Sequence, residues 1–202
     1  MMLPETIVGL FSLAFVAMIT PGPNNLVALT VSVGGDPGKI SKACSGIIAG
    51  TVCLIVLCWF GAASIFEILP GLQLVIVGLG CAYLLWGGAY LFLSAWRRSS
   101  GPGQSLPSSF WGLVCFQFVN PKAWVLCVAA VSAIQGRRSD LHGLIVLAAI
   151  FAIASTSTLA IWIGAGRLLP RRRSGEDTSP WVSALLGLAL IGTSASLAIS
   201  AF

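Results

Sequence analysis

The sequence predicts an all-α integral membrane protein, and three observations support this fold class. Of the 202 residues, 57% are hydrophobic and only 8% are charged, whereas about a quarter of the residues in soluble domains carry charge. Six apolar runs are each long enough to cross a hydrocarbon core about 30 Å thick as a helix. The runs fill most of the chain, so we expect a single transmembrane domain over residues 1–202 and no separate soluble domain.

The predicted spans follow one another with short connections between them. Residues 1–6 contain no basic residue, and five further spans follow the first, so we do not expect the first span to be a cleaved signal peptide. The six transmembrane helices are predicted at about residues 6–31, 43–66, 71–95, 110–134, 142–166 and 181–201.

Basic residues in the connections predict the orientation of these helices. If all six spans cross, one side of the membrane carries eight basic residues and the other carries two. The positive-inside rule then places both termini outside the cytoplasm. Membrane topology thus accounts for the net charge of +5, and no nucleic-acid partner is needed to explain it. The eight residues are Lys39, Lys42, Arg97, Arg98, Arg167, Arg171, Arg172 and Arg173, and the two are Arg137 and Arg138.

The two halves of the chain are punctuated at equivalent places, which predicts an internal repeat. With three spans in each half, the second copy enters the membrane from the opposite side, so the repeats are inverted. Secondary transporters with this architecture bind substrate where interrupted helices of the two repeats meet. The repeats are predicted at about residues 1–96 and 108–202, with spans 1 and 4 interrupted. A shift of one hundred residues superposes Pro21 on Pro121, Val31-Ser32 on Val131-Ser132, and Pro70 on Pro170.

Span 1 is interrupted after Thr20 by two prolines, a glycine and two asparagines. The prolines remove backbone donors, so carbonyls one turn earlier must be buried in protein or line a wet cavity. The half-helix that follows begins with free N–H groups and a positive dipole end, which suit a carboxylate. The alternative is a proline kink that only shapes packing. The candidate substrate-binding residues are Pro21, Gly22, Pro23, Asn24 and Asn25.

Span 4 is broken by Pro121 and carries Lys122 about twelve residues from its start. A charge at this depth is costly and indicates a functional site. The ammonium could bind the carboxylate of an amphoteric solute, could be held by carbonyls freed by Pro121, or could carry a proton because burial favours the neutral amine. Alternatively, Lys122 could extend to the membrane surface. Gln117 and Asn120 lie close to it in sequence, and both are candidate substrate-binding residues.

Other polar and aromatic residues leave alternatives open. The run Ser155-Thr156-Ser157-Thr158 could bond back to its own helix carbonyls or line a cavity. Most of the tryptophans lie toward span ends, where an interfacial aromatic belt explains them, whereas Trp124 lies near Lys122 and could wall a cavity. The tryptophans assigned to the belt are Trp59, Trp86, Trp96, Trp111, Trp162 and Trp181.

Glycines in spans 2, 3 and 6 predict close approach between helices. The same small-residue faces leave a homo-oligomer open. They are Gly46, Gly50, Gly78, Gly80, Gly87, Gly88, Gly187 and Gly192.

The reactive residues argue against several function classes. The six cysteines form no CxxC pair and fit a packing role; His142 is the single histidine, and no carboxylates cluster. We therefore expect no metal site, no cofactor and no catalytic residues, so the protein is not predicted to be an enzyme. A membrane thiol-redox conductor would need cysteines meeting from corresponding helices, yet the counterpart of Cys115 is Phe15. An ion channel with a similar six-helix fold is a further alternative to a transporter.

Four motifs together resemble the LysE/RhtB amino-acid exporter family over nearly the whole chain. The Pro-Gly-Pro-Asn-Asn sequence, with Ser-Phe-Trp at 109–111 and Gln-Phe-Val-Asn at 117–120, is most similar to the cysteine/O-acetylserine exporter subgroup. The four motifs are Thr20–Asn25, Gly46-x-x-x-Gly50, Gly80–Gly87 and Phe118–Lys122.

The resemblance implies a secondary active exporter in a bacterial inner membrane, driven by a proton or ion gradient. Its solute would be an amino acid or derivative, such as cysteine or O-acetylserine, homoserine or threonine, or a basic amino acid. No family motif follows residue 140, so the roles of spans 5 and 6 stay open. The family's site positions fall on Pro21, Gly22, Pro23, Asn24, Asn120, Pro121 and Lys122.

Overall fold

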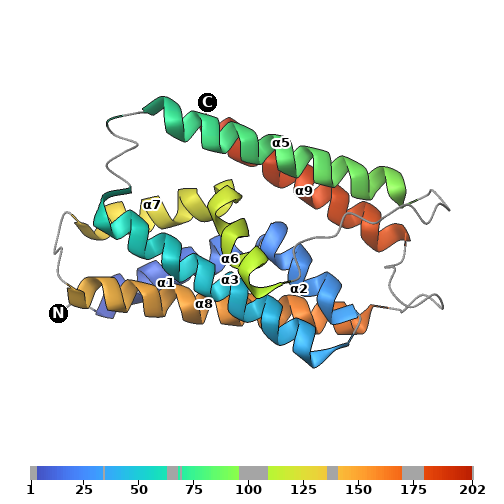
Figure 1. Ribbon diagram of the computed structural model, residues 1–202, viewed down its shortest axis with the longest axis horizontal. Coiled ribbons are helices and arrows are strands. Elements are labelled where there is room, and N and C mark those ends of the chain that lie inside the picture. Colours follow the sequence, from blue (N-terminus) through green and yellow to red (C-terminus); the bar gives the residue numbers. More distant parts are fainter. Residues whose placement is uncertain are drawn as a thin grey trace.

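The computed structural model describes residues 4–33, 35–62, 68, 70–95, 109–135, 141–169 and 180–201. Every regular element in these ranges is helical, which confirms the predicted all-α fold class (Figure 1). The elements are α1 (Pro4–Ile19), α2 (Pro23–Val33), α3 (Pro37–Leu57), the π-helical turn η1 (Cys58–Ala62), α5 (Pro70–Ser94), α6 (Phe110–Val119), α7 (Pro121–Gln135), α8 (Leu141–Leu168) and α9 (Pro180–Ala201).

Local sequence signals set the ends of α3. Asp36 caps its start, where the carboxylate accepts hydrogen bonds from the backbone N–H of Gly38 at 2.8 Å and of Lys39 at 3.3 Å. Pro37 occupies the first turn, where no backbone donor is lost from the helix. The end is a widened turn in which Gly61 has φ 111°, a conformation that glycine adopts without steric cost.

Both predicted helix interruptions are present. The break between α1 and α2 bends the chain by 62°, and the break between α6 and α7 bends it by 70°. In the described residues, Pro37–Gly61 and Leu141–Leu168 are each long and apolar enough to cross a membrane. Counting each bent pair as one span raises the number to four, whereas α5 and α9 contain shorter apolar stretches. The predicted total of six spans therefore stays a prediction.

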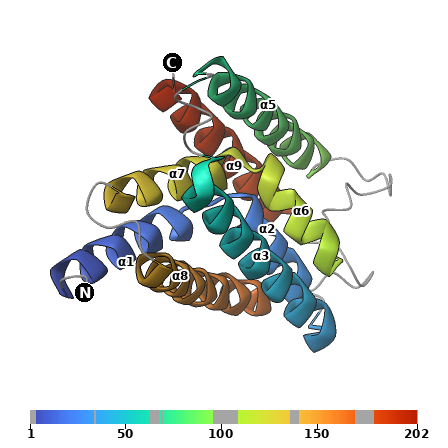
Figure 2. The ribbon, with the colours of Figure 1, turned by 60° about the vertical axis from the view of Figure 1, so that its left-hand side comes forward.

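The helices form a body with a two-helix layer along one edge. Figures 1 and 2 show α5 and α9 side by side in this layer. In the body, α3 packs against α6, and α8 packs against both α1 and α2. Helices α3 and α8 also contact each other. Both bent pairs are thus held between the long helices.

Glycines allow the closest of these helix contacts. A Cβ atom on Gly50 of α3 would lie 2.6 Å from Cγ of Gln117 on α6. In the two-helix layer, a Cβ on Gly88 would lie 2.7 Å from the Gly187 carbonyl oxygen, and one on Gly187 would lie 2.6 Å from the Gly88 oxygen. The packing prediction is confirmed for these glycines and for Gly46 and Gly80. It is wrong for Gly78 and Gly192, where a Cβ would meet nothing within 4 Å in the described part of the chain.

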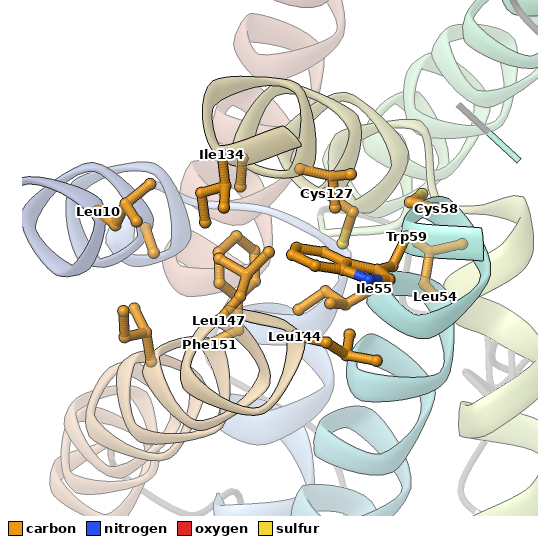
Figure 3. Close-up of a cluster of buried hydrophobic side chains, with 14 of the residues drawn as sticks. Leu10, Leu54, Ile55, Cys58, Trp59, Cys127, Ile134, Leu144, Leu147 and Phe151 are labelled. Atoms are coloured by element: carbon orange, nitrogen blue, oxygen red, sulfur yellow. The ribbon is translucent and has the colours of Figure 1, made fainter. Parts of the chain in front are cut away.

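The largest hydrophobic cluster joins α1, α3, η1, α7 and α8 (Figure 3). Phe151 and Leu147 from α8 meet Ile55 of α3, Leu10 of α1 and Ile134 of α7 in this cluster. Dense packing of this kind holds the long helices against the bent pairs. Trp59 is also buried there, so its assignment to an interfacial belt is wrong; Trp86, Trp111 and Trp181 are exposed, as a belt requires.

Several sequence-based expectations lie outside the described residues. The predicted orientation uses seven arginines in undescribed connections, whereas Lys39, Lys42 and Arg167 are described. The repeat boundaries near residues 96 and 108 and Trp96 fall outside as well. The side of the membrane on which the termini lie and the boundaries of the two repeats therefore stay predictions. The residues concerned also include Arg97, Arg98, Arg137, Arg138, Pro170, Arg171, Arg172 and Arg173.

Candidate functional site

The first break exposes a series of backbone carbonyls at the end of α1. A helix leaves its last four carbonyls without intrahelical donors, and Pro21 and Pro23 bring no N–H groups of their own. Side chains supply the missing donors. Within α1 and its break, the Thr20 hydroxyl donates to the Ala17 oxygen at 2.8 Å, and the Asn25 amide donates to the oxygens of Met18 and Thr20, both at 2.8 Å.

Helices α8 and α9 provide further donors to the same segment. The indole N–H of Trp162 donates to the Ile19 oxygen at 3.1 Å. The Thr193 hydroxyl lies 2.8 Å from the Pro21 oxygen and 2.8 Å from the Ala189 oxygen of its own helix, so its one proton is shared between them. The first break is therefore held by groups from other helices. Trp162 is half-buried, and its assignment to the interfacial belt stays a prediction.

Lys122 reaches from the second break to the first. Its ammonium donates hydrogen bonds to the carbonyl oxygen and hydroxyl of Thr20, both at 2.7 Å, and lies 3.5 Å from the Pro21 oxygen. One sequence-based option placed the ammonium on carbonyls freed by Pro121; the acceptors instead belong to the other break. A Cβ on Gly22 would lie 3.2 Å from the Lys122 nitrogen. The absent side chain at Gly22 therefore makes room for the ammonium.

The ammonium has no carboxylate partner in the part of the chain that the structure describes. Its hydrogen-bond acceptors there are neutral oxygens. Glu5 and Asp36, the acidic residues in that part, lie at the starts of α1 and α3. Neutral carbonyls solvate a buried ammonium without cancelling its charge. The site therefore retains a positive charge that an anionic group could neutralise.

The second break is satisfied locally. Asn120 is the residue between α6 and α7, and its side-chain oxygen accepts from the backbone N–H of Lys122 at 3.2 Å. Its carbonyl accepts from the N–H groups of Ala123 and Trp124 at 3.1 and 3.3 Å. The Trp124 indole donates to the Phe118 oxygen at 2.8 Å. Trp124 thus caps α6 and is not among the residues that line the cavity described below.

A reciprocal amide pair joins the two halves of the molecule. Asn24 on α2 donates to the Gln117 side-chain oxygen, and Gln117 on α6 donates to the Asn24 oxygen, each at 2.9 Å. Gln117 also donates to the Leu113 carbonyl at 3.3 Å and is fully buried. Both partners of the pair are satisfied, so the pair can fix the position of α2 against α6.

A cavity lies between the two breaks and the long helices α3 and α8. The volume open to the centres of water molecules is about 40 Å³. This is room for about three of them. The lining residues are Met18, Gly22, Pro23, Asn24, Asn25, Thr51, Asn120, Lys122, Ala123, Leu126, Cys127, Phe151, Ser155, Thr158 and Leu159.

Six of the nine candidate substrate-binding residues predicted from the sequence line the cavity. The other three have different neighbours. Pro21 borders a smaller space against α8 and α9, Gln117 pairs with Asn24, and a Cβ on Gly80 would meet the ring of Pro121. The six that line the cavity are Gly22, Pro23, Asn24, Asn25, Asn120 and Lys122.

The N-terminus of α2 presents open backbone donors beside this cavity. The first backbone bond at this end runs from Leu26 N–H to the Gly22 oxygen. Pro23 has no N–H, and the N–H groups of Asn24 and Asn25 have no acceptor among the described residues. In α7, by contrast, Asn120 takes up the corresponding donors. The open end of α2 is suited to an anionic group.

The wall opposite the two breaks carries hydroxyls from the polar run at residues 155–158 of α8, for which the sequence left a back-bonding and a cavity-lining alternative open. Ser155 and Thr158 line the cavity. Thr156, Ser157 and Thr158 bond back to the carbonyls of Ala152, Ile153 and Ser155. The back-bonding alternative therefore holds for three residues and the cavity-lining alternative for two, with Thr158 in both groups. The Ser155 hydroxyl is buried and has no hydrogen-bond partner in the described part of the chain. The i, i+3 spacing of Ser155 and Thr158 was the available signal.

The cysteines are free, and several have the packing role that their positions predicted. Cys58, Cys81 and Cys127 are buried, whereas Cys53 and Cys115 are exposed. Cys58 and Cys127 belong to one core cluster (Figure 3). They follow α3 and lie in α7, which are not corresponding helices of the predicted repeats. Among the described residues, no group of three potential metal ligands is present.

Comparison with known proteins adds an independent line of evidence. Residues 15–201 match the family described as LysE type translocator. A leucine efflux protein of Enterobacter sp. (strain 638) is 30% identical over 196 residues, covering 92% of this chain and 91% of the relative. A cysteine/O-acetylserine efflux protein of Escherichia coli (strain K12) is 26% identical over 193 residues, covering 92% and 95%. No solved structure matches the chain.

Proposed function

Because the chain belongs to the LysE type translocator family, we propose that it is a secondary exporter of a neutral amino acid or a close derivative. Both relatives named above are efflux proteins for such solutes, leucine in one case and cysteine or O-acetylserine in the other. We further propose that it works in a bacterial inner membrane. The exported solute would occupy the cavity between the two breaks.

The proposed membrane arrangement is six spans in two inverted repeats. Two features of the packing support it. The first half-helix of each bent pair lies against the long helix of the other half, α1 on α8 and α6 on α3. The last helices of the two halves, α5 and α9, pack against each other through Gly88 and Gly187, each of which faces the carbonyl of the other. The distribution of basic residues supports periplasmic termini.

The proposal rests on a positively charged site in which no described carboxylate neutralises the Lys122 ammonium. The Lys122 ammonium and the open amide end of α2 border the same cavity. In the proposed complex the substrate carboxylate lies between them. Asn24, Asn25 and Asn120 then offer amide groups to its remaining polar atoms. This arrangement recognises the part that all amino acids share, as inverted-repeat transporters do at broken helices.

The rest of the cavity favours a neutral side chain. Among the described residues, its lining contains no carboxylate, and its one charged group is the cationic Lys122. A lysine or arginine substrate would thus bring a second buried cation without a partner, which is costly. Apolar groups from Met18, Leu126 and Phe151 and the hydroxyls of Thr51 and Ser155 can surround an aliphatic or small polar side chain.

We propose proton coupling through Lys122, the charged side chain at the centre of this site. A protonated lysine holds the substrate carboxylate, and loss of the proton releases it. The return of the empty site would then require Lys122 to be protonated again. The hydrogen bonds to Thr20 give the charged form a place to rest when no substrate is bound.

Counterflow in proteoliposomes tests the function directly. Vesicles preloaded with an unlabelled amino acid should accumulate the same amino acid in labelled form, with saturation. We expect exchange of leucine, cysteine or O-acetylserine and none of lysine or arginine. The rate should respond when the experiment is repeated under a second pH gradient. Saturable exchange of no amino acid would contradict the proposal, and a conductance without saturation would indicate a channel.

A cysteine-free variant is the matched control for the redox alternative. If all six cysteines are replaced by serine and exchange persists, a thiol-redox conductor is excluded. Loss of exchange in that variant, with the protein still folded, would instead favour thiol chemistry.

A further inference from the structure

The end of α1 is built to hold a cation. Lys122 places its ammonium against three oxygens, the carbonyl and hydroxyl of Thr20 at 2.7 Å and the Pro21 carbonyl at 3.5 Å. The C-terminal end of a helix carries a partial negative charge, which adds to the attraction. Carbonyls of unwound helices coordinate small cations in other membrane transporters. A tethered ammonium occupies such a position here.

The oxygen cluster does not depend on Lys122 for its position. Asn25 already donates to the Thr20 carbonyl at 2.8 Å, and the Thr193 hydroxyl lies 2.8 Å from both the Pro21 carbonyl and the Ala189 carbonyl of its own helix, which share its one proton. The Thr20 hydroxyl gives its proton to the Ala17 oxygen, so its lone pairs face other partners. Since each carbonyl has two lone pairs, one remains for a cation on each of them. The cluster therefore stays organised if the ammonium moves away.

We propose that this cluster, formed by the Thr20 carbonyl and hydroxyl and the Pro21 carbonyl, is a binding site for a monovalent alkali cation. Lys122 fills it in the conformation described, and Na⁺ or K⁺ takes its place when the ammonium leaves. A divalent ion is disfavoured because its usual ligands include carboxylates, and the cluster consists of neutral oxygens. Such oxygens replace the hydration shell of a monovalent ion.

The site has a consequence for transport. When Lys122 turns toward a substrate carboxylate, the negative end of α1 loses its cation. An alkali ion that enters then keeps the break intact while the substrate is bound. This consequence rests on the proposed export function, whereas the site itself can be tested without any transport measurement.

The test removes the ammonium and offers free ions in its place. The full chain carrying Lys122→Met is purified, and its thermal unfolding midpoint is followed in KCl, NaCl or choline chloride at equal ionic strength. We expect a saturable rise with K⁺ or Na⁺, ~3–6 °C at a tenfold excess over the Kd, and none with choline. The unaltered chain should show no difference between the salts because Lys122 occupies its own site.

Matched variants assign the effect to the cluster. Lys39→Met makes the same chemical change at an exposed position in the first turn of α3 and should show no cation dependence. Adding Thr20→Val to Lys122→Met removes one ligand and should weaken the ion's effect at least several-fold. A cation-independent Lys122→Met midpoint would overturn the proposal. An equal rise in the unaltered chain would overturn it too.

The cation site can be tested even if Lys122→Met is unstable. If Lys122→Met cannot be purified in choline chloride, the proposal predicts recovery of folded, monodisperse protein in KCl or NaCl. Recovery in neither salt would contradict it. Because none of these measurements involves an amino acid, a negative result leaves the export proposal standing, and absent counterflow leaves the ion site standing.

Discussion

The two helix breaks differ in the source of their hydrogen-bond partners. At the first break, carbonyls from the end of α1 accept from Lys122 of α7, Trp162 of α8 and Thr193 of α9. At the second, Asn120 and Trp124 satisfy the chain within and beside α7. Any relative movement of the helices must therefore alter the first break. At the second break the backbone partners come from α6, α7 and the residue between them.

The largest expected effect is at the group that joins the two breaks. Lys122→Ala removes the ammonium from Thr20 and from the proposed carboxylate site. Since a hydrogen bond to a charged group contributes up to about 3 kcal/mol, we expect export to fall ~100-fold or more. Efflux is measured in cells and normalised to the amount of membrane-inserted protein. Lys39→Ala is the control and should transport normally; normal efflux from well-expressed Lys122→Ala would refute the central role of this residue.

A matched pair of tryptophan substitutions compares the two breaks directly. Trp162→Phe removes the donor to Ile19 at the first break, and Trp124→Phe removes the donor to Phe118 at the second. Each should lower the free energy of unfolding by about 1–2 kcal/mol by leaving a carbonyl without its donor. Their effects on transport should differ. We expect ~10-fold slower counterflow for Trp162→Phe and less than about a twofold change for Trp124→Phe, both per folded molecule.

Equal losses of counterflow in the two variants would show that the two breaks contribute equally to transport. A larger loss of counterflow for Trp124→Phe than for Trp162→Phe would show that the second break matters more for transport. Unfolding curves for both proteins separate these outcomes from simple differences in stability.

The amide pair tests whether the first break is tied to the other half of the molecule. Asn24→Leu or Gln117→Leu alone leaves one amide without its partner, whereas the double variant removes both. A double-mutant cycle on unfolding free energy should give a coupling of ~1 kcal/mol. Additive effects within about 0.3 kcal/mol would mean that the contact does not hold α2 against α6.

Sequence patterns predicted the breaks because proline and glycine act locally. Pro21, Pro23 and Pro121 remove backbone donors wherever the chain places them, and the described helices bend at these residues. Apolar run lengths likewise predicted the helices.

What could not be predicted is which distant side chain meets each freed carbonyl. Trp162 was assigned to an interfacial belt, and Thr193 carried no signal. Nothing in a single sequence places them beside Ile19 and Pro21. Lys122 was identified as a site by its depth, yet its acceptors belong to a segment about one hundred residues earlier. Long-range pairing of this kind depends on tertiary packing. Ser155 faces the cavity for the same reason.

The smallest expected effect concerns Ser155, on the wall that faces both breaks. Its buried hydroxyl has no partner among the described residues, so Ser155→Ala should leave the unfolding midpoint unchanged or raise it slightly. If the hydroxyl contacts substrate, affinity in counterflow should fall about three- to fivefold, which corresponds to the loss of one neutral hydrogen bond. Ser157→Ala is the matched control, because its hydroxyl bonds back to Ile153. A destabilised Ser155→Ala protein with unchanged affinity would mean that this hydroxyl serves packing, and that substrate is held by the two breaks alone.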